Sequence, residues 1–384
     1  MKILEISFLP PDKMSGGGMG IYQSIKSLLG IADVDYIGPQ YNSTLFADAK
    51  YTLNNLCILK AGKRSFGRYF FRKVSTLFYD DWKEFADNIK WSNYDLVHIE
   101  SSRYFFAVDE AKKHKAKVVI RMHNIESDYG LNLYRKHKSV SNYLRYRSYR
   151  SNEKKTVCKV DALIFLTESD ILRARQLYNV SPEISFKNPV CIDANSDSIA
   201  TTENNFEFPI RFLMTGTLNY GSNVDGIIWF LENVWNEYCR DSNHALTIAG
   251  AHPNNRLKKV ISKIQNVYLV DTPEDMKPYF DSAYVYIAPI FDGAGMKVKV
   301  AEAFSHGLPV IGTTHAFIGY ENIENGKFVA DTSQEFVEQI NKLYDLRFQV
   351  RRTDVFNEFC QKLSITASVA FYKNLLKITN GENK

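Results

Sequence analysis

The sequence lacks most features that would place it outside the globular intracellular proteins. Its five cysteines are scattered and odd in number, and no C-x-x-C pair or Cys/His spacing typical of a metal site occurs. Reduced thiols in a cytoplasmic protein are therefore expected. No run approaches the roughly 18 consecutive apolar residues that a membrane-spanning helix requires. The apolar N-terminal run is interrupted by Glu5 and ends at two prolines, so no signal peptide is predicted.

The signatures of common cofactor sites are also missing. Residues 15–20 are rich in glycine, but their spacing is not G-x-G-x-x-G and no P-loop lysine follows them. Residues 33–35 read Asp-Val-Asp, nominally a metal–nucleotide pattern, yet they border the second predicted strand. The sequence therefore predicts neither a bound cofactor nor a metal ion.

The sequence does contain enough apolar side chains for a large core. Hydrophobic residues make up 45% of the 384 positions, and the 25 Phe and 23 Tyr exclude disorder as the main state. The length predicts two to three domains. The net charge of +5 hides an asymmetry, because 29 basic and 20 acidic residues occur through Glu183, against 19 and 23 in the remainder.

Short apolar, β-branched runs alternate with longer helical patterns in both halves of the chain. This alternation indicates the α/β class, with two Rossmann-like, doubly wound parallel-sheet domains. The predicted strands cover residues 2–8, 34–38, 96–99, 118–121 and 162–166, then 212–215, 246–249, 267–270, 283–288 and 310–312. The predicted helices cover residues 19–29, 67–89, 104–114, 143–157 and 169–178, then 225–238, 255–264, 296–306 and 333–346.

The polar stretch 191–207 is predicted to connect two domains, 1–190 and 191–353, and a last helix is expected at about 354–378. Ligands of doubly wound sheets bind beyond the carboxyl ends of the strands. The cleft between the two facing domains is therefore the expected site.

The glycine-rich segment 16–20 follows the first predicted strand and opens a helix. Gly17 and Gly18 allow close approach of a ligand, and free amides at a helix start favour a phosphate or another anion. The alternative is a tight turn without a ligand.

Residues 121–126, Arg-Met-His-Asn-Ile-Glu, lie just past a predicted buried strand. His123 there can bind a sugar hydroxyl or carry a proton, with Arg121, Asn124 and Glu126 as further contacts of the acceptor or sugar. The alternative is a structural histidine with Glu126 capping a turn.

The strongest pattern covers residues 289–311. An apolar strand ends in a glycine-rich loop, and Lys297 lies in the first turn of the helix that follows. A cation is unfavourable at this end of a helix unless an anion occupies the site, so Lys297 and the loop amides are predicted to hold a diphosphate. Glu302, on the same helix, could accept hydrogen bonds from ribose hydroxyls. The alternative is a solvated helix with Lys297 and Lys299 exposed.

This run resembles the C-terminal signature of retaining family 4 glycosyltransferases (group 1), which have the GT-B fold. Gly295, Glu302 and the turn 307–310 match the pattern, and residues 215–223 resemble the glycine-rich loop of the nucleotide domain. Residues 121–126 resemble an R-x-H-N-x-E segment of bacterial polysaccharide-assembly enzymes, and the family's last helix crosses back onto the first domain. The resemblance implies donor contacts from Gly17, Gly18, Gly216, Thr217, Asn219, Asn223, Gly293, Ala294, Gly295, Met296, Lys297 and Glu302.

The sequence departs from this family at two places. Ala294 stands where the family has a first glutamate that contacts the donor sugar, and Asp292 or a main-chain amide is the alternative contact. Residues 217–223 also lack the usual Arg and Lys, so Lys297, or else Arg103 or Arg121, is expected to meet the leaving group.

The implied reaction is glycosyl transfer from a nucleotide sugar to an acceptor hydroxyl with retention of configuration. Stabilising the departing diphosphate is the largest electrostatic contribution available, and His123, Lys297 and Glu302 are the predicted catalytic residues. A front-face reaction, in which the donor phosphate takes the acceptor proton, is preferred. A nucleotide-sugar epimerase and a non-catalytic glycan-binding subunit remain as alternatives.

Two basic stretches suggest where the acceptor binds. Residues 60–73 contain six Lys/Arg and no acid, and residues 134–155 contain eight Lys/Arg, one acid and four Tyr. Basic and aromatic residues on helices suit an anionic membrane surface or a lipid-linked glycan acceptor. The alternative is a solvated helix face, and no nucleic-acid motif is present. A cytoplasmic protein, peripheral on the inner membrane face, is therefore expected.

Overall fold

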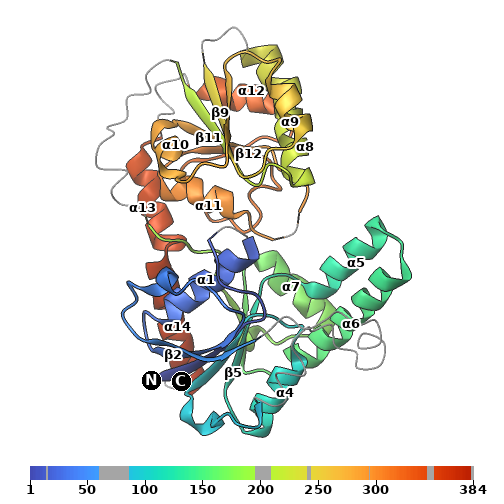
Figure 1. Ribbon diagram of the computed structural model, residues 1–384, viewed down its shortest axis with the longest axis vertical. Helices are drawn as coiled ribbons and strands as arrows, with labels where there is room; N and C mark the ends of the chain where they lie inside the picture. The colour runs from blue at the N-terminus through green and yellow to red at the C-terminus, as the bar shows by residue number, and fades with distance from the viewer. Residues whose placement is uncertain are drawn as a thin grey trace. The chain divides into compact units, whose positions relative to one another are not determined.

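The computed structural model describes residues 1–13, 16–59, 86–194, 209–239, 244–293, 295–343 and 350–381 (Figure 1). The chain divides into two compact units. The N-terminal unit comprises Met1–Cys191 and Ile365–Lys384, and the C-terminal unit comprises Ile192–Ser364. Each unit has its own parallel sheet covered by helices, which confirms the predicted α/β class with two Rossmann-like domains.

The sheet of the N-terminal unit has seven strands in the order β3-β2-β1-β4-β5-β6-β7. The sequence predicts all of them except β3 and β7, the edge strands, because edge strands need not be buried and β3 is largely exposed. The strands are β1 (Lys2–Ile6), β2 (Asp33–Gly38), β3 (Leu53–Ile58), β4 (Leu96–Ile99), β5 (Val118–Met122), β6 (Ala162–Phe165) and β7 (Ser185–Lys187).

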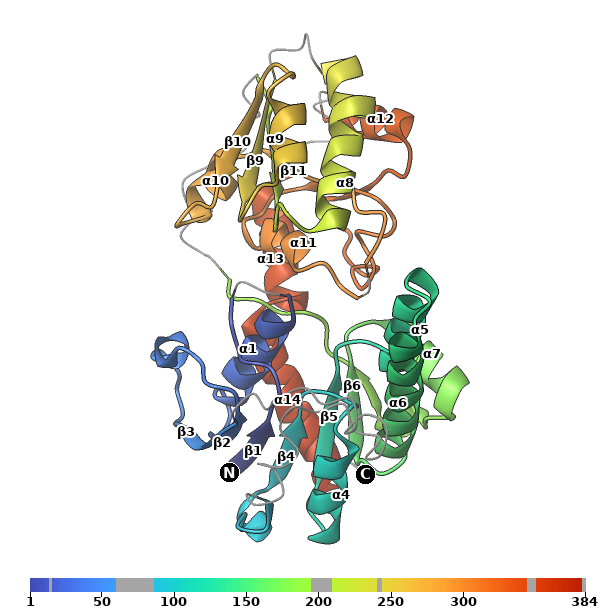
Figure 2. The same cartoon turned by 45° about the vertical axis from the view of Figure 1, so that its right-hand side comes forward.

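Helices cover both faces of this sheet. On one face, α4 (Phe105–Lys113), α6 (Val140–Val157) and α7 (Glu168–Tyr178) pack against an apolar core. On the other face, α1 (Gly16–Leu28) and α14 (Ile365–Asn380) lie side by side (Figure 2).

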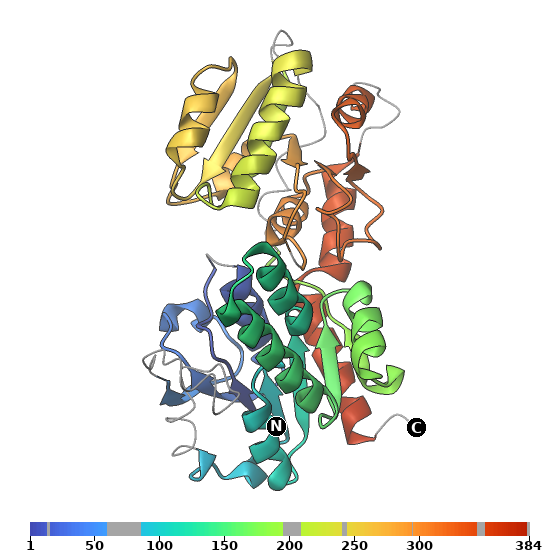
Figure 3. The same cartoon turned by 90° about the vertical axis from the view of Figure 1, so that its right-hand side faces the viewer.

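A hairpin of two helices stands out in the N-terminal unit. It is formed by α5 (Glu126–Lys136) and α6, which pack against each other along their length (Figure 3). The sequence predicts α6 but not α5, because the buried residues of α5, Glu126, Ser127 and Gly130, are not apolar and give no hydrophobic pattern. The predicted helix 67–89 lies mostly outside the described residues.

The strands of the N-terminal sheet alternate between two very different faces. Leu4, Val97 and Ile120 point into the apolar core under α4, α6 and α7. The residues that follow them, Glu5, His98 and Arg121, are buried on the face under α1 and α14. Because successive side chains of a strand point to opposite faces, one sheet carries an apolar layer and a charged layer.

The sheet of the C-terminal unit has six strands in the order β10-β9-β8-β11-β12-β13. Its strands are β8 (Arg211–Thr215), β9 (Ala245–Gly250), β10 (Val267–Asp271), β11 (Val285–Ala288), β12 (Val310–Gly312) and β13 (Lys327–Val329). Its helices are α8 (Gly221–Phe230), which continues as a π-helical segment (Leu231–Cys239), α9 (Asn255–Ile261), α10 (Lys277–Ser282), α11 (Val298–Ser305), α12 (Ser333–Lys342) and α13 (Arg352–Lys362).

The C-terminal segment differs from the single helix predicted at 354–378. The chain forms α13 in the C-terminal unit, is interrupted at residues 363–364, and then forms α14 in the N-terminal unit. The buried Arg352 holds α13 by donating hydrogen bonds to the carbonyl oxygens of His306 (2.8 Å) and Ala283 (3.3 Å). Among the described residues, no helix is long and apolar enough to cross a membrane.

Candidate functional site

The first part of the candidate site in the C-terminal unit follows β8. The chain turns at Gly216 and enters α8, where the Asn223 amide donates to the carbonyl oxygen of Thr217 at 3.1 Å. A Cβ at Gly216 would lie 3.0 Å from the Lys299 Nζ and 3.1 Å from the Asn223 Nδ2. Glycine therefore leaves open the space beside the Lys299 ammonium.

Lys299 links this loop to α11. Its Nζ donates to the Asn223 Oδ1 at 2.8 Å, across two segments that are far apart in the sequence. Burial lowers the pKa of the Lys299 ammonium to about 8, although the nearby Glu302 carboxylate opposes this shift. The amide oxygen of Asn223 is a neutral partner, so the positive charge of Lys299 remains available to an anion.

The second part of the site is the loop between β11 and α11. Lys297 is the N-cap residue of α11, and its Nζ turns back to donate to the carbonyl oxygens of Gly293 (2.6 Å) and Gly295 (2.8 Å). The His315 Nε2 also lies 2.7 Å from the Gly293 oxygen. Burial lowers the pKa of Lys297 to about 8, with Asp292 opposing the shift. Lys297 therefore fixes the conformation of this loop. A phosphate bound here would share the Lys297 ammonium with the carbonyl oxygens of Gly293 and Gly295.

The remaining predicted donor contacts range from exposed to buried positions. Thr217 and Asn219 are exposed in the loop after β8, Met296 is buried, and Glu302 is half-buried on α11. Burial raises the pKa of Glu302, which Lys299 opposes. Ala294 lies outside the described residues, so the substitution of the family's first glutamate has no structural account.

A small pocket lies where β8 and β11 end, and Lys299 is the one charged side chain among the described residues that line it. This is the carboxyl edge of the sheet, where ligands of such folds bind. The pocket is lined by Met214, Thr215, Asn223, Ile227, Tyr286, Ile287, Ala288, Pro289, Ile290 and Lys299.

The candidate residues of the N-terminal unit gather at the carboxyl ends of β4 and β5. Gly17 and Gly18 lie in the first turn of α1, and Gly20 follows in the next turn. A Cβ at Gly20 would lie 2.8 Å from the Cε1 and 2.9 Å from the Nδ1 of His123. The glycine-rich start of α1 and the predicted histidine are therefore in contact, although the sequence alone does not join them.

Two of the predicted sugar contacts are buried. Arg121 is 1% exposed and its Nη2 donates to the carbonyl oxygen of Pro189 at 3.3 Å, within the polar layer under α1 and α14. Glu126 is 2% exposed and pairs with the Arg103 Nη2 at 3.0 Å. Burial raises the pKa of Glu126 to about 7, with Arg103 opposing the shift. His123 and Asn124 are partly exposed and remain accessible.

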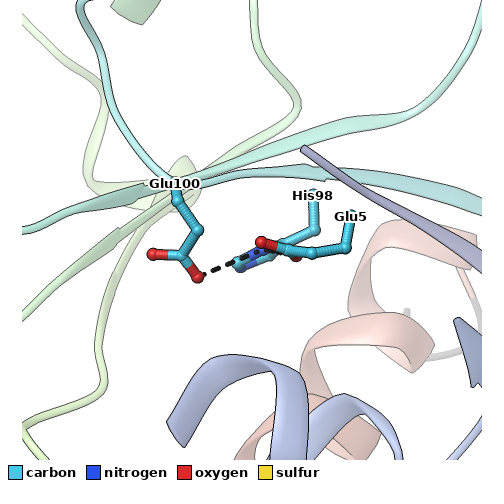
Figure 4. A group of neighbouring side chains, drawn as sticks. All are labelled: Glu5, His98 and Glu100. Carbon is cyan, nitrogen blue, oxygen red and sulfur yellow. Dashed lines mark hydrogen bonds and ion pairs between the residues drawn. The ribbon is translucent and has the colours of Figure 1, made fainter. Parts of the chain in front are cut away.

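Glu5, His98 and Glu100 form a buried cluster (Figure 4), and Glu100 also contacts His123. Glu5 and His98 are register partners on β1 and β4, and their Oε2 and Nδ1 atoms lie 2.7 Å apart. The three residues each offer a metal-ligand atom, all within 4.8 Å of one another. The positive charge of Arg121 acts on both carboxylates, however, so the cluster fits a network of ion pairs better than a cation site.

Lys299 and Glu100 are the two residues of interest that the sequence did not single out. Lys299 carries a signal, since it lies three residues before Glu302 and so on the same side of the helix. Glu100 carries none, because its role depends on β4 and β5 being neighbours in the sheet.

Residues 209–345 match the family model described as "Glycosyl transferases group 1". The whole fold is similar to Anabaena Alr3699/HepE in complex with UDP, at 14% identity and a TM-score of 0.67, covering 98% of this chain and 100% of that one. It is similar to a glycosyltransferase from Rickettsia africae ESF-5 (13% identity, TM-score 0.69, covering 100% and 99%). It is also similar to the lipopolysaccharide outer core galactosyltransferase WaaB (12% identity, TM-score 0.64, covering 100% of both chains).

A curated relative is the uncharacterized 44.6 kDa protein in the cps region of Klebsiella pneumoniae. It is 24% identical over 236 residues, which are 58% of this chain. The chain thus spans 58% of the length of this relative. The structural likenesses establish the GT-B fold, as expected from the sequence.

Proposed function

Since the chain has the GT-B fold and its C-terminal unit belongs to the glycosyl transferases of group 1, we propose that it is a retaining glycosyltransferase. It moves a sugar from a nucleotide-diphosphate sugar to a hydroxyl of a glycan or a lipid-linked acceptor. The observation that carries the proposal is the contact of Lys299 with Asn223 beside the open face of Gly216, at the start of α11.

The leaving group is the part of the reaction for which these residues are best suited. A diphosphate that departs from the sugar gains negative charge, and a preorganised cation in a water-poor pocket stabilises that charge. Lys299 supplies the cation, and the N-terminal end of α11 adds partial positive charge. Glu302 binds the ribose hydroxyls, and the donor phosphate takes the acceptor proton.

The ligands of the similar structures indicate which donor nucleotide to test first. HepE has been crystallised with UDP and with UDP-glucose, so UDP is the first nucleotide to test. A thermal-shift panel of UDP, GDP, TDP, CMP and their sugars should raise the melting temperature with one nucleotide diphosphate, because a ligand of the folded state stabilises it. No response to any of them would refute the donor site.

The products of the reaction separate the proposal from the two alternatives. A transferase releases the nucleotide diphosphate and forms a new glycosidic bond when an acceptor is present. An epimerase would instead return an isomerised nucleotide sugar without acceptor, and a glycan-binding subunit would turn over neither.

The acceptor is proposed to approach on an anionic membrane surface, through the α5–α6 hairpin. The one acid of residues 134–155, Glu153, is fully buried, where it accepts hydrogen bonds from the Ser127 amide (3.0 Å) and the Tyr178 hydroxyl (2.6 Å). The solvent-facing side of this stretch therefore carries basic residues without carboxylates. Val140 and Tyr143 are exposed beside them, at 73% and 42%. The other basic stretch, 60–73, lies outside the described residues.

Vesicle binding tests this surface. Each basic residue contributes about 1 kcal/mol at an anionic membrane, so the triple variant Arg135→Glu, Lys138→Glu, Arg147→Glu should lose about 100-fold in affinity for phosphatidylcholine–phosphatidylglycerol vesicles. The control carries the same charge change on the C-terminal unit, as Lys259→Glu, Lys263→Glu, Lys342→Glu. Equal binding by both variants would refute the proposed membrane surface. The proposed transferase activity does not depend on that result.

A further inference from the structure

Glu100 is hydrogen-bonded to one nitrogen of the His123 ring. Glu100 directly follows β4 and His123 directly follows β5, two neighbouring strands, so both side chains reach the same edge of the sheet. The Glu100 Oε2 forms a short hydrogen bond with the His123 Nε2. Glu100 is 4% exposed, while the His123 side chain is 18% exposed. The ring nitrogen that faces the protein interior is therefore Nε2.

The adjoining Nδ1–Cε1 edge of the ring lies against α1. A Cβ atom at Gly20 would lie 2.8 Å from the Cε1 and 2.9 Å from the Nδ1 of His123. Both distances are shorter than a normal contact, so a residue other than glycine does not fit there. The backbone of α1 and the carboxylate of Glu100 thus hold the ring from two sides. Its rotation would cost the hydrogen bond to Glu100.

The surroundings of Glu100 keep its charge in place. Burial alone would raise the pKa of Glu100, but the charges of His123, His98 and Arg121 lower it to about 2. Burial raises the pKa of Glu5 in the same cluster, so Glu100 is the carboxylate that is fully ionised at neutral pH. The second carboxylate oxygen, Oε1, has no hydrogen-bond partner among the residues that the structure describes, and it lies 3.7 Å from the His98 Nδ1.

We propose that Glu100 is the positioning residue of the reaction: its hydrogen bond to Nε2, together with the close approach of Gly20 to the Nδ1–Cε1 edge, fixes the ring of His123 so that its exposed part faces the sugar or acceptor. Glu100 itself is buried and does not contact substrate. The inference rests on the proposed function, since it assigns His123 to the reacting centre. It adds that His123 acts through a fixed ring orientation, imposed from the neighbouring strand.

Steady-state kinetics test the proposal with the full chain. The substrate is UDP-glucose, or the nucleotide sugar of the thermal-shift panel that raises the melting temperature, and the readout is release of the nucleotide. Glu100→Ala should lower kcat by about 10- to 100-fold, because a small misplacement of a catalytic group costs up to about 100-fold. Glu100→Asp and Glu100→Gln, which can still accept from Nε2, should recover part of this loss. Affinity for the free nucleotide diphosphate should stay unchanged.

A matched control is Glu5→Gln. Glu5 is as buried as Glu100 and lies on the same sheet face, but it contacts His98 and not His123. The variant should keep kcat within about twofold of the wild type, since a glutamine resembles the protonated carboxyl that burial favours there. An equal loss of kcat in Glu5→Gln and Glu100→Ala would assign both losses to the fold and overturn the positioning role.

Nuclear magnetic resonance of selectively 15N-labelled histidine gives a readout that a purely structural role would not move. The chain has eight histidines, and the ring signals of His123 are identified with the variant His123→Gln. In the wild type, Nε2 should show the shift of a protonated, hydrogen-bonded nitrogen, and Glu100→Ala should abolish this signature. Unchanged ring signals in a folded Glu100→Ala would refute the proposal. Normal binding of nucleotide in the same sample would show that the donor site, and with it the proposed function, still stands.

Discussion

The two units stabilise the carboxyl edges of their sheets by different means. In the N-terminal unit, the charged pairs Glu5–His98 and Glu100–His123 occupy the sheet face and edge behind the candidate site. In the C-terminal unit, the register partners Leu213 and Tyr286 occupy the central strands, and the charged residues Lys297, Lys299 and Glu302 lie at the start of α11 and along it. The N-terminal unit therefore orients the side chains of its candidate site through buried ion pairs. In the C-terminal unit, glycines shape the backbone of the candidate site and lysines supply its positive charge.

Substitution of a closely packed glycine in the C-terminal unit should reduce the free energy of unfolding most. Gly250→Ala tests this and has the largest effect that we expect. A Cβ there would lie 1.9 Å from the carbonyl oxygen of Gly216, in the loop that opens the site. We expect a loss of about 3 kcal/mol in the free energy of unfolding, since an overpacked backbone contact cannot relax. Gly221→Ala is the control, because its Cβ would meet no atom of the described part of the chain within 4 Å. Similar unfolding midpoints in urea for the two variants would contradict the account.

The charges of the N-terminal unit should instead give it a pH-dependent stability, which Glu126→Gln tests with a smaller effect. The pKa of Glu126 is 4.5 in its ordinary state and about 7 in the folded protein, where burial disfavours the charged form. The folded state binds this proton more tightly than the unfolded state does. The contribution of Glu126 to the free energy of unfolding is therefore greatest below about pH 4.5 and is lost as the pH rises to about 7.

Replacing Glu126 with glutamine removes this titration. We expect Glu126→Gln to gain on the order of 1 kcal/mol at pH 8 relative to the wild type, and nothing at pH 4. Hydrogen–deuterium exchange of peptides from α5 and α6 reads this locally. A variant that is less stable at pH 8 would show that the ion pair with Arg103 outweighs the burial of the carboxylate.

The fold could be predicted from the sequence because its central strands are buried on both faces. Such strands have continuous apolar runs, as in residues 162–165 and 285–288, and these runs alternate with helices. The edge strand β3 lacks this pattern because its side chains are largely exposed. The polar residues Glu5 and His98 do not disturb the prediction, because only one face of the sheet carries them.

The candidate site could be predicted as a set of loops but not as a set of contacts. Lys297 and Lys299 lie on the same short segment, and the sequence favours Lys297 because the predicted helix start places it in the first turn, where a cation is unfavourable unless an anion is bound. The helix begins at Val298, two residues later than predicted, so Lys297 becomes the N-cap residue and turns back onto the loop. Lys299 then reaches Asn223, which is 76 positions away. Contacts at such separation depend on β8 and β11 being neighbours in the sheet, and they leave no local pattern.

The central claim is that Lys299 binds the diphosphate of the donor, and titration calorimetry of UDP at pH 8.5 tests it most directly. Because burial lowers the pKa of Lys299 to about 8, binding of an anion should draw a proton from the buffer. Two buffers of different ionisation enthalpy measure that uptake. We expect Lys299→Ala to bind UDP about 10- to 100-fold more weakly, with less proton uptake, since a hydrogen bond to a charged group contributes about 1.5–3 kcal/mol. Lys297→Ala, which mainly loosens the loop, should lose less affinity. Wild-type affinity and proton uptake in Lys299→Ala would contradict the account.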